Sequence, residues 1–409
     1  MLREIWVVLT IATVIAGLAM QNAAVVALGA LIGVACYAAL LWARFSLRRL
    51  TYERIVPEDH AFPGETIALD LRITNRKPLP LPWIEIRERF PTAMITDAGD
   101  EFGLAGRVDL MQTDWRTSIG GDQRVSRRYE LYCPDRGVYE IGPARLRSGD
   151  LFGLFSEERV EDRLTRVVVY PRTVDIGDLG LPARRPFGER ATGMRVFEDP
   201  SRVAGVRDYA PGDSMRRIDW NATARLGKLQ SRIYDPSSSR HLLLCLNTQT
   251  IIPSWAGYIA DVLERTITVA ASIARDAYER RYSVGLLANG SFPDADRSIR
   301  IPPGRRPEQF IRILEALAII TPFVLEPLAA ALDREEHRLV LGTTIAIATG
   351  IMTDELASTL LRLRRRGHTV VVITTSGQTW DAQLGDTIPV HDASTIGLPW
   401  RANYANATP

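Results

Sequence analysis

Cysteine is scarce in this chain of 409 residues, which contains only Cys36, Cys133 and Cys245. The three are far apart in the sequence, and none forms a pair with the spacing of a metal site. Cys36 lies in an apolar run and Cys245 in a predicted core strand, so a disulfide framework is not expected. This cysteine usage fits a reducing compartment.

Net charge is nearly absent as well, with a formal value of +2. The balance favours neither nucleic acid nor an acidic substrate as a partner. Lysine is rare: Lys77 and Lys228 are the exceptions among 50 basic residues that are otherwise arginine. The length predicts two or three domains.

The motifs of common catalytic chemistry are missing from the sequence. It contains no glycine-rich phosphate loop, dinucleotide fingerprint, HExxH, CxxC or GxSxG motif. The five histidines are scattered, and no pair of carboxylates can be placed across a cleft. We therefore predict no catalytic residue, no cofactor and no small-molecule substrate, which favours a protein that is not an enzyme.

Long hydrophobic runs are present only near the N-terminus. Residues 5–19 and 23–42 carry no charge and are separated by the polar turn 20–22. A membrane-spanning helix needs about 20 apolar residues, and the first run is slightly short. Residues 1–50 are predicted to form a two-helix transmembrane hairpin that contacts the lipid bilayer through residues 5–42.

Basic residues on both sides of this hairpin predict its orientation. Arg3 precedes it, whereas Arg44, Arg48, Arg49 and Arg54 follow it. The positive-inside rule then predicts a two-pass protein of the cell membrane, with both termini and the soluble domains in the cytoplasm. In the alternative reading, the first run is a cleaved signal peptide and the rest lies outside.

Residues 51–171 show short alternating runs that end at turns. In the run Thr66–Thr74 alternate residues are apolar, as in a strand with one buried face. Further strands are predicted at Trp83–Phe90, Val125–Cys133, Val138–Leu146 and Arg166–Tyr170. Strands at such intervals favour an all-β, sandwich-like domain. Residues 92–122, which are rich in Gly and Asp, are predicted to be an excursion from it.

Residues 241–409 alternate between apolar strands and amphipathic helices. Strands are predicted at His241–Leu246, Tyr282–Ala288, Arg338–Ala348 and His368–Thr374, and helices at 255–279, Pro307–Ile319 and Asp354–Arg366. This order predicts an α/β domain with a doubly wound parallel sheet. Ligands of such sheets bind at the carboxyl ends of the strands.

Three side chains at these carboxyl ends could belong to an ion site. They are Asn247, Gln249 and Thr349, which carry amides and a hydroxyl but no carboxylate. Because Mg²⁺ prefers anionic oxygen ligands, we predict that no metal is held tightly there.

Residues 172–240 are predicted to be an Arg-rich connection that contains a dense signature segment, residues 207–235. Pro211-Gly212 is a turn signal, after which Asp213 or Ser214 could cap a helix. Apolar residues at helical spacing predict that one face of this short helix is buried; they are Met215, Ile218, Ala222 and Leu226.

Charged and aromatic side chains of the signature segment form either a structural brace or an interaction surface. They are Arg207, Tyr209, Asp213, Arg216, Arg217, Asp219, Trp220 and Arg225. A second hypothesis is electrostatic binding of anionic lipid or nucleic acid, because residues 201–240 hold eight Lys or Arg against four Asp. The interspersed Asp residues argue against it, against nucleic acid in particular. A third hypothesis is an envelope-associated enzyme.

Three stretches together resemble the domain of unknown function 58 family. They are PGETIALDLRITNRKPLPLPWIEI at 63–86, CPDRGVYEIGPARLRSGDLFGLF at 133–155, and RDYAPGDSMRRIDWNATARLGKLQSRIYD at 207–235. The third stretch is the most specific to that family.

The resemblance implies a von Willebrand factor A-like domain at the C-terminal end. It also implies a MoxR-type AAA+ ATPase as a partner, and so a membrane-anchored scaffold or adaptor for proteins. Such domains usually bind partners through a divalent ion held by a DxSxS motif. Here Asn247, Gln249 and Ile251 stand at the motif's positions and Thr349-Gly350 at a later one, a departure that argues against metal-dependent adhesion.

Overall fold

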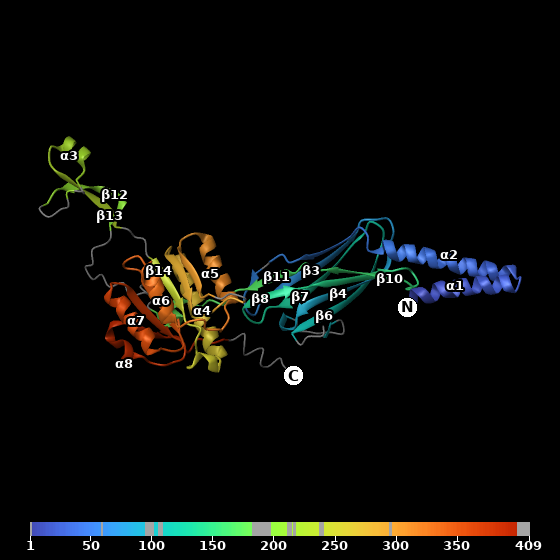
Figure 1. The fold of residues 1–409 in the computed structure, drawn as a ribbon. Helices are drawn as coiled ribbons and strands as arrows, with labels where there is room; N and C mark the ends of the chain where they lie inside the picture. The colour runs from blue at the N-terminus through green and yellow to red at the C-terminus, as the bar shows by residue number, and fades with distance from the viewer. Residues whose placement is uncertain are drawn as a thin grey trace. The chain divides into compact units, whose positions relative to one another are not determined.

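The computed structural model describes residues 2–58, 60–94, 102–104, 109–181, 198–210, 215, 218–236, 241–293 and 297–398 (Figure 1). The chain forms two compact units. The N-terminal unit comprises Met1–Arg172 with Leu314–Ile319 and Gly397–Pro409, and the C-terminal unit comprises Thr173–Ile313 and Ile320–Ile396. The predicted multidomain, mixed α/β organisation is confirmed.

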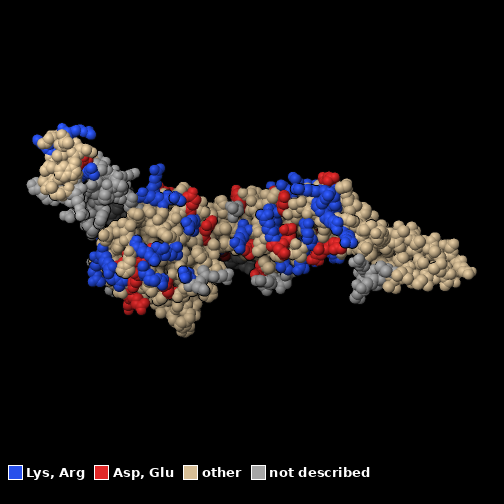
Figure 2. Space-filling view, turned by 45° about the horizontal axis from the view of Figure 1, so that its top comes forward, with Lys and Arg blue, Asp and Glu red and all other residues tan. Residues whose placement is uncertain are grey.

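The N-terminal unit begins with two helices, α1 (Leu2–Ala19) and α2 (Ala23–Ser46), which lie side by side (Figure 1). Glycine allows their close approach, because a Cβ at Gly29 would lie 2.7 Å from Cγ2 of Val14. Among the described residues, only α2 is long and apolar enough to cross a membrane; the apolar part of α1, Val8–Ala19, is shorter. The face of this pair in view in Figure 2 shows no charged side chain among its described residues.

The end of α2 is fixed to the β-sheets by basic side chains. Lys77 donates hydrogen bonds from Nζ to the carbonyl oxygens of Ser46 and, at 3.0 Å, Arg48. Arg159 donates from Nη1 to the carbonyl oxygen of Leu50 at 3.1 Å. Burial and the neighbouring Arg159 lower the pKa of Lys77 to about 8. Cationic donors satisfy the carbonyls that a helix C-terminus leaves free.

Eleven strands among the described residues form the sheets of the N-terminal unit. They are β1 (Leu50–Ile55), β2 (His60–Ala61), β3 (Thr66–Asn75), β4 (Leu81–Pro91), β5 (Phe102–Leu104), β6 (Leu110–Ile119), β7 (Arg124–Tyr132), β8 (Gly137–Ile141), β9 (Ala144–Gly149), β10 (Ser156–Glu161) and β11 (Thr165–Val169). Their orders are β1-β3-β7, β10-β9-β4-β6-β5 and β2-β11-β8. One apolar core lies among them.

The alternation in the sequence predicts these strands well where it is regular. In β3 every second residue is buried: Ile67, Leu69, Leu71 and Ile73. Two predictions are wrong. The predicted excursion 92–122 contains the ten-residue strand β6, and the predicted strand Val138–Leu146 is divided into β8 and β9, which join different sheets. The division falls at Gly142-Pro143, where Pro143 has no N–H to donate and Gly142 has φ of +116°.

A charged pair is buried inside this unit. The side chains of Arg54 and Glu88 are 3% and 0% exposed, and Arg54 Nε lies 2.6 Å from Glu88 Oε2. The same oxygen accepts a hydrogen bond from the hydroxyl of Tyr52. Burial, then Glu88, raises the pKa of Tyr52. The carboxylate of Glu88 is thus bound by Arg54 and Tyr52 inside the unit.

The C-terminal unit contains a six-stranded sheet of order β16-β15-β14-β17-β18-β19. Its strands are β14 (His241–Leu246), β15 (Ser283–Ala288), β16 (Ile299–Gly304), β17 (Thr344–Thr349), β18 (Thr369–Thr374) and β19 (Val390–Asp392). All neighbouring strands are parallel except β15 and β16. The helices are α4 (Ala260–Glu279), α5 (Pro307–Ile319), α6 (Leu328–Glu336), α7 (Asp354–Arg365) and the short α8 (Asp381–Leu384).

Helices cover both faces of this sheet (Figure 1). Leu243 and Cys245 of β14 share a core with α6 and α7. Alternate residues such as Leu244 point to the opposite face, where α4 packs on β14, β15 and β17. The predicted alternation of strands and helices is confirmed, although the strand predicted from Arg338 begins only at Thr344. However, α4 begins at Ala260 rather than 255, because Gly257 with φ of +114° interrupts the chain before it.

Candidate functional site: the carboxyl edge of the C-terminal sheet

A buried network of amides and a hydroxyl joins the carboxyl ends of β14, β15 and β17. Asn247 donates from Nδ2 to Oγ1 of Thr349 at 3.0 Å and accepts at Oδ1 from Nδ2 of Asn289 at 2.9 Å. Oδ1 of Asn289 accepts in turn from the backbone N–H of Thr248 at 2.8 Å. Asn247 is 3% exposed, and Asn289 and Thr349 are fully buried.

This network lies where the strand order reverses. β14 has β15 on one side and β17 on the other, and crevices at such points are the usual ligand sites of α/β sheets. Here the polar atoms hold one another: Thr349 Oγ1 also donates to the carbonyl oxygen of Ile351 at 2.5 Å. A closed, neutral network fixes the strand ends and supplies no anionic ligand for a cation.

The structure places the three predicted ion-site positions differently. Asn247 and Thr349 are brought into direct contact. The side chain of Gln249 instead donates from Nε2 to the carbonyl oxygen of Ile251 at 3.1 Å. Among the described residues, no group of three or more His, Cys, Asp and Glu side chains is arranged to hold a metal.

The sequence analysis did not group Asn289 with the three predicted ion-site positions. The signal was available, since Asn289 follows a buried strand just as Asn247 does. Its partners are 41 and 42 positions away in the sequence. That the two strands are direct neighbours is a property of the sheet.

Large apolar side chains are exposed on the loops at this edge. The loop after β14 presents Trp255, 86% exposed, and Tyr258, 51% exposed. The loop after α5 presents Phe323, which is 72% exposed. A hydrogen bond from Leu325 N to Asn289 O, at 3.1 Å, holds this loop at the end of β15. Large exposed aromatic residues on the loops of one sheet edge are typical of protein interaction sites. The edge is therefore polar inside and apolar outside.

The signature segment forms a separate element of the C-terminal unit. β12 (Glu198–Asp208) and β13 (Gln230–Pro236) pair antiparallel, and the helix α3 (Trp220–Leu226) connects them. Residues 172–240, predicted to be an Arg-rich connection, thus contain a paired ribbon from Glu198 onward, where pairing with β13 supplies the order that the sequence pattern lacks.

Asp219 organises this element. Its Oδ1 accepts from the backbone N–H of Ala222 at 3.0 Å, which caps α3, and its Oδ2 accepts from Nε of Arg232 at 3.0 Å. The hydrogen bond from Ala222, and then that from Arg232, lowers the pKa of Asp219. The capping prediction named Asp213 or Ser214, which lie outside the described residues; α3 itself begins after Asp219.

The predicted buried face of this helix is wrong. Met215 is 64% exposed and Leu226 62% exposed, whereas Ile218 alone is deeply buried, at 3%. A seven-residue helix above a two-stranded ribbon has little surface to cover it. Trp220, predicted as part of the brace or interaction surface, is also 64% exposed.

The structure describes five of the eight residues predicted as brace or interaction surface. Arg207 donates to the carbonyl oxygen of Asp208 at 3.2 Å, and the backbone N–H of Tyr209 donates to Leu229 O at 2.9 Å. Arg225 is exposed. Asp213, Arg216 and Arg217 lie outside the described residues. Sequence reasoning missed Arg232 and Gln230, whose Nε2 donates to Asp208 Oδ1 at 2.6 Å.

Comparison with known proteins gives a family match over part of the chain. The profile of the family described as "Protein of unknown function DUF58" matches residues 205–395. This range contains the signature segment and the six-stranded sheet.

One curated protein is a distant relative of this chain. The uncharacterized protein YeaD of Bacillus subtilis (strain 168) is 22% identical over 321 residues, which cover 78% of this chain and 75% of YeaD.

Two solved structures resemble a part of the chain weakly. The CARDB domain of the PF1109 protein from Pyrococcus furiosus has 12% identity and a TM-score of 0.21, covering 29% of this chain and 86% of that domain. The sporulation control protein Spo0M of Bacillus subtilis has 12% identity and a TM-score of 0.18, covering 30% and 49%. Likenesses of this size support no argument about function.

Proposed function

We propose that this protein is a membrane-attached adaptor, which binds a protein partner at the carboxyl edge of its C-terminal sheet. The observation that carries the proposal is the combination at that edge: a closed neutral network inside, and exposed Trp255, Tyr258 and Phe323 outside. Such an edge offers apolar contact area instead of a metal or a nucleophile.

We assign the C-terminal unit to the von Willebrand factor A-like domains. When the strands of the six-stranded sheet are numbered in chain order, their order in the sheet is 3-2-1-4-5-6, and the third strand, β16, is antiparallel. The neutral network occupies the position at which such domains usually hold an ion, so partner binding here proceeds through apolar side chains. The resemblance described above supports a MoxR-type AAA+ ATPase as the partner.

The membrane attachment is assigned to α1 and α2 as a two-pass hairpin. Its support is the length and hydropathy of α2, the glycine contacts between the helices, and Arg44, Arg48 and Arg49 after the apolar run. The excess of Arg on this side favours a cytoplasmic position for both units.

The proposal is tested by measuring binding between two purified proteins. The full chain is reconstituted in lipid nanodiscs, and its affinity for a MoxR-type ATPase from the same organism is measured by biolayer interferometry. We expect Trp255→Ala and Phe323→Ala each to weaken binding by roughly tenfold or more, because truncating a central aromatic residue costs about 2 kcal/mol or more.

Leu341→Ala is the matched control. Leu341 is 58% exposed, but it precedes β17 and so lies at the opposite edge of the same sheet. Equal losses for the control and the two test variants, or wild-type affinity in Trp255→Ala and Phe323→Ala, contradict the proposal.

A further inference from the structure

The turn between β9 and β10 carries two large apolar side chains that are largely exposed. Leu151 is 66% exposed and Phe152 is 75% exposed, and both lie at the tip of a hairpin beside α2. From this position we propose that the turn Asp150–Phe155 inserts into the lipid bilayer beside α2 as an additional membrane contact. The inference rests on the proposed attachment through α2.

The tip is built as a fixed turn. Asp150, 1% exposed, accepts hydrogen bonds from the backbone N–H of Phe152 at 2.9 Å and of Phe155 at 2.6 Å. The indole of Trp83 donates to the carbonyl oxygen of Asp150 at 2.9 Å. Because Asp150 holds the backbone, Leu151 and Phe152 are presented outward without first having to be ordered.

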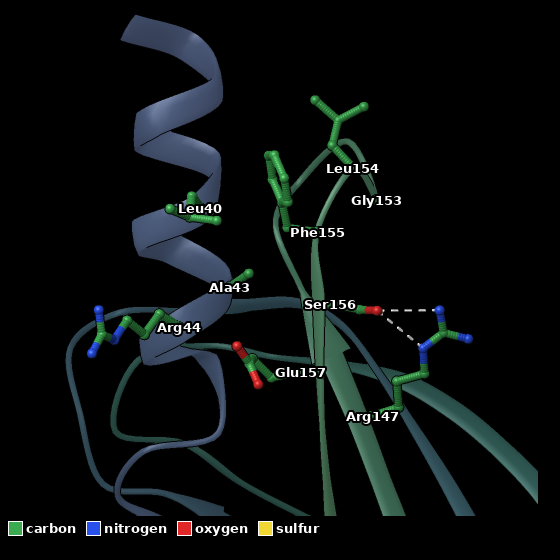
Figure 3. A pocket seen from close by; sticks show the side chains of 9 residues that line it. All are labelled: Leu40, Ala43, Arg44, Arg147, Gly153, Leu154, Phe155, Ser156 and Glu157. Carbon is green, nitrogen blue, oxygen red and sulfur yellow. Dashed lines mark hydrogen bonds between the residues drawn. The ribbon is translucent and has the colours of Figure 1, made fainter. Parts of the chain in front are cut away.

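The level of the tip along α2 determines what surrounds it. Phe155 packs on Ala39 and Ala43, and Leu154 is packed against the same cluster together with Cys36. In Figure 3 the turn at Gly153 and Leu154 lies at the level of Leu40 or higher along the axis of α2, and Arg44 lies below that level. At 1.5 Å per residue, Cys36 lies about 12 Å from Arg44 along the helix. The tip therefore faces the last apolar turns of α2, a level at which a membrane-spanning helix is surrounded by lipid.

Polar and aromatic residues indicate where the membrane surface lies. Trp42 and Tyr37 of α2 are at the same level as the hairpin, and aromatic residues of this kind favour the interface. Arg44 and Arg147 line a pocket of about 590 Å³ between α2 and the hairpin, together with Glu157 (Figure 3). Arg147 donates a hydrogen bond from Nε to Oγ of Ser156 at 3.2 Å. In the proposed arrangement these charges lie at the level of the phospholipid headgroups, and the apolar tip lies deeper in the bilayer.

The experiment measures the depth of the tip in reconstituted vesicles of phosphatidylcholine and phosphatidylglycerol. In a Cys36→Ala background, Leu151→Cys is labelled with an environment-sensitive fluorophore, and quenching by lipids with spin labels at known depths is recorded. Cys133 and Cys245 are fully buried and are not expected to react. We expect strong quenching and a blue shift at position 151, and neither at Val160→Cys, which is 45% exposed near the other end of β10.

A second change tests the apolar contact itself. Phe152→Asp in the labelled protein is expected to lower the inserted population by about tenfold or more. The change removes the larger of the two apolar side chains that insertion would bury in the bilayer. Phe152→Trp keeps an apolar side chain and is expected to retain insertion, which separates loss of insertion from a damaged turn.

The outcomes distinguish this inference from the proposed attachment. If the wild-type protein does not float with vesicles, the attachment itself is wrong. If it floats but position 151 is quenched no more than position 160, or if Phe152→Asp leaves quenching unchanged, the insertion of the turn is overturned.

Discussion

Two buried polar networks, one in each unit, have opposite chemistry. In the N-terminal unit, Arg54, Glu88 and Tyr52 form a charged network inside the sheets. In the C-terminal unit, Asn247, Asn289 and Thr349 form a neutral one at a sheet edge. The charged network is the more costly to disturb, since removing one partner leaves a charge in a medium of low polarity.

The difference shows that burial and polarity do not by themselves mark a functional site. The charged network resembles a catalytic set, yet the carboxylate of Glu88 is held by Arg54 and Tyr52 within the core. The neutral network resembles ordinary packing, yet it supports the sheet edge whose loops carry exposed aromatic side chains. Position in the fold separates the two readings.

The largest effect is expected from Glu88→Gln, which leaves Arg54 buried without its counter-ion. We expect the N-terminal unit to lose about 3–5 kcal/mol of its free energy of unfolding. Hydrogen exchange followed by mass spectrometry on the full chain reports this loss in peptides from β1 and β4, separately from the C-terminal unit.

Asp70→Asn is the control in the same unit. Asp70 lies 2.8 Å from Arg128, whose side chain is 65% exposed, so water screens this pair and a much smaller loss of stability is expected than for Glu88→Gln. If Glu88→Gln costs no more than this control, the buried charged network does not stabilise the unit as described.

A smaller effect is expected from Asn289→Ala, which removes one member of the neutral network. Thr248 N–H then lacks its acceptor, and a buried unsatisfied group costs about 1–3 kcal/mol. The same exchange experiment detects the loss in peptides from β14 and β15, whereas peptides from β1 and β4 stay unchanged. Asn221→Ala, at an exposed position, is expected to stay within about 0.5 kcal/mol.

The smallest effect concerns pH and asks whether the C-terminal core tolerates a charge. Burial lowers the pKa of His368, which is 3% exposed. Below its ordinary pKa the unfolded chain binds a proton that the folded unit resists, so stability is complete above that pH and is lost as the pH falls. We expect thermal unfolding between pH 7.5 and 5.5 to shift less in His368→Gln than in the wild type; an equal shift in both contradicts the role of His368.

Regular patterns in the sequence predict much of the fold. The alternation in β3 correctly assigns Ile67, Leu69, Leu71 and Ile73 to the core, because side chains of a strand alternate between its faces. Continuous apolar runs likewise predict β14 at His241–Leu246. The pattern fails where it is weak: β6 and β12 owe their order to pairing with β4 and β13, which lie elsewhere in the chain.

By itself, the sequence determined the apolar helices, the mixed α/β organisation and the residues that follow each C-terminal strand, because these depend on composition and on local periodicity. Only the tertiary structure decided that Asn289 joins Asn247 and Thr349, that Glu88 faces inward to Arg54, and that the turn at Leu151 lies beside α2. Each of these contacts joins residues far apart in the chain. The free energy that selects them comes from packing and from the satisfaction of buried polar groups, which no local pattern encodes.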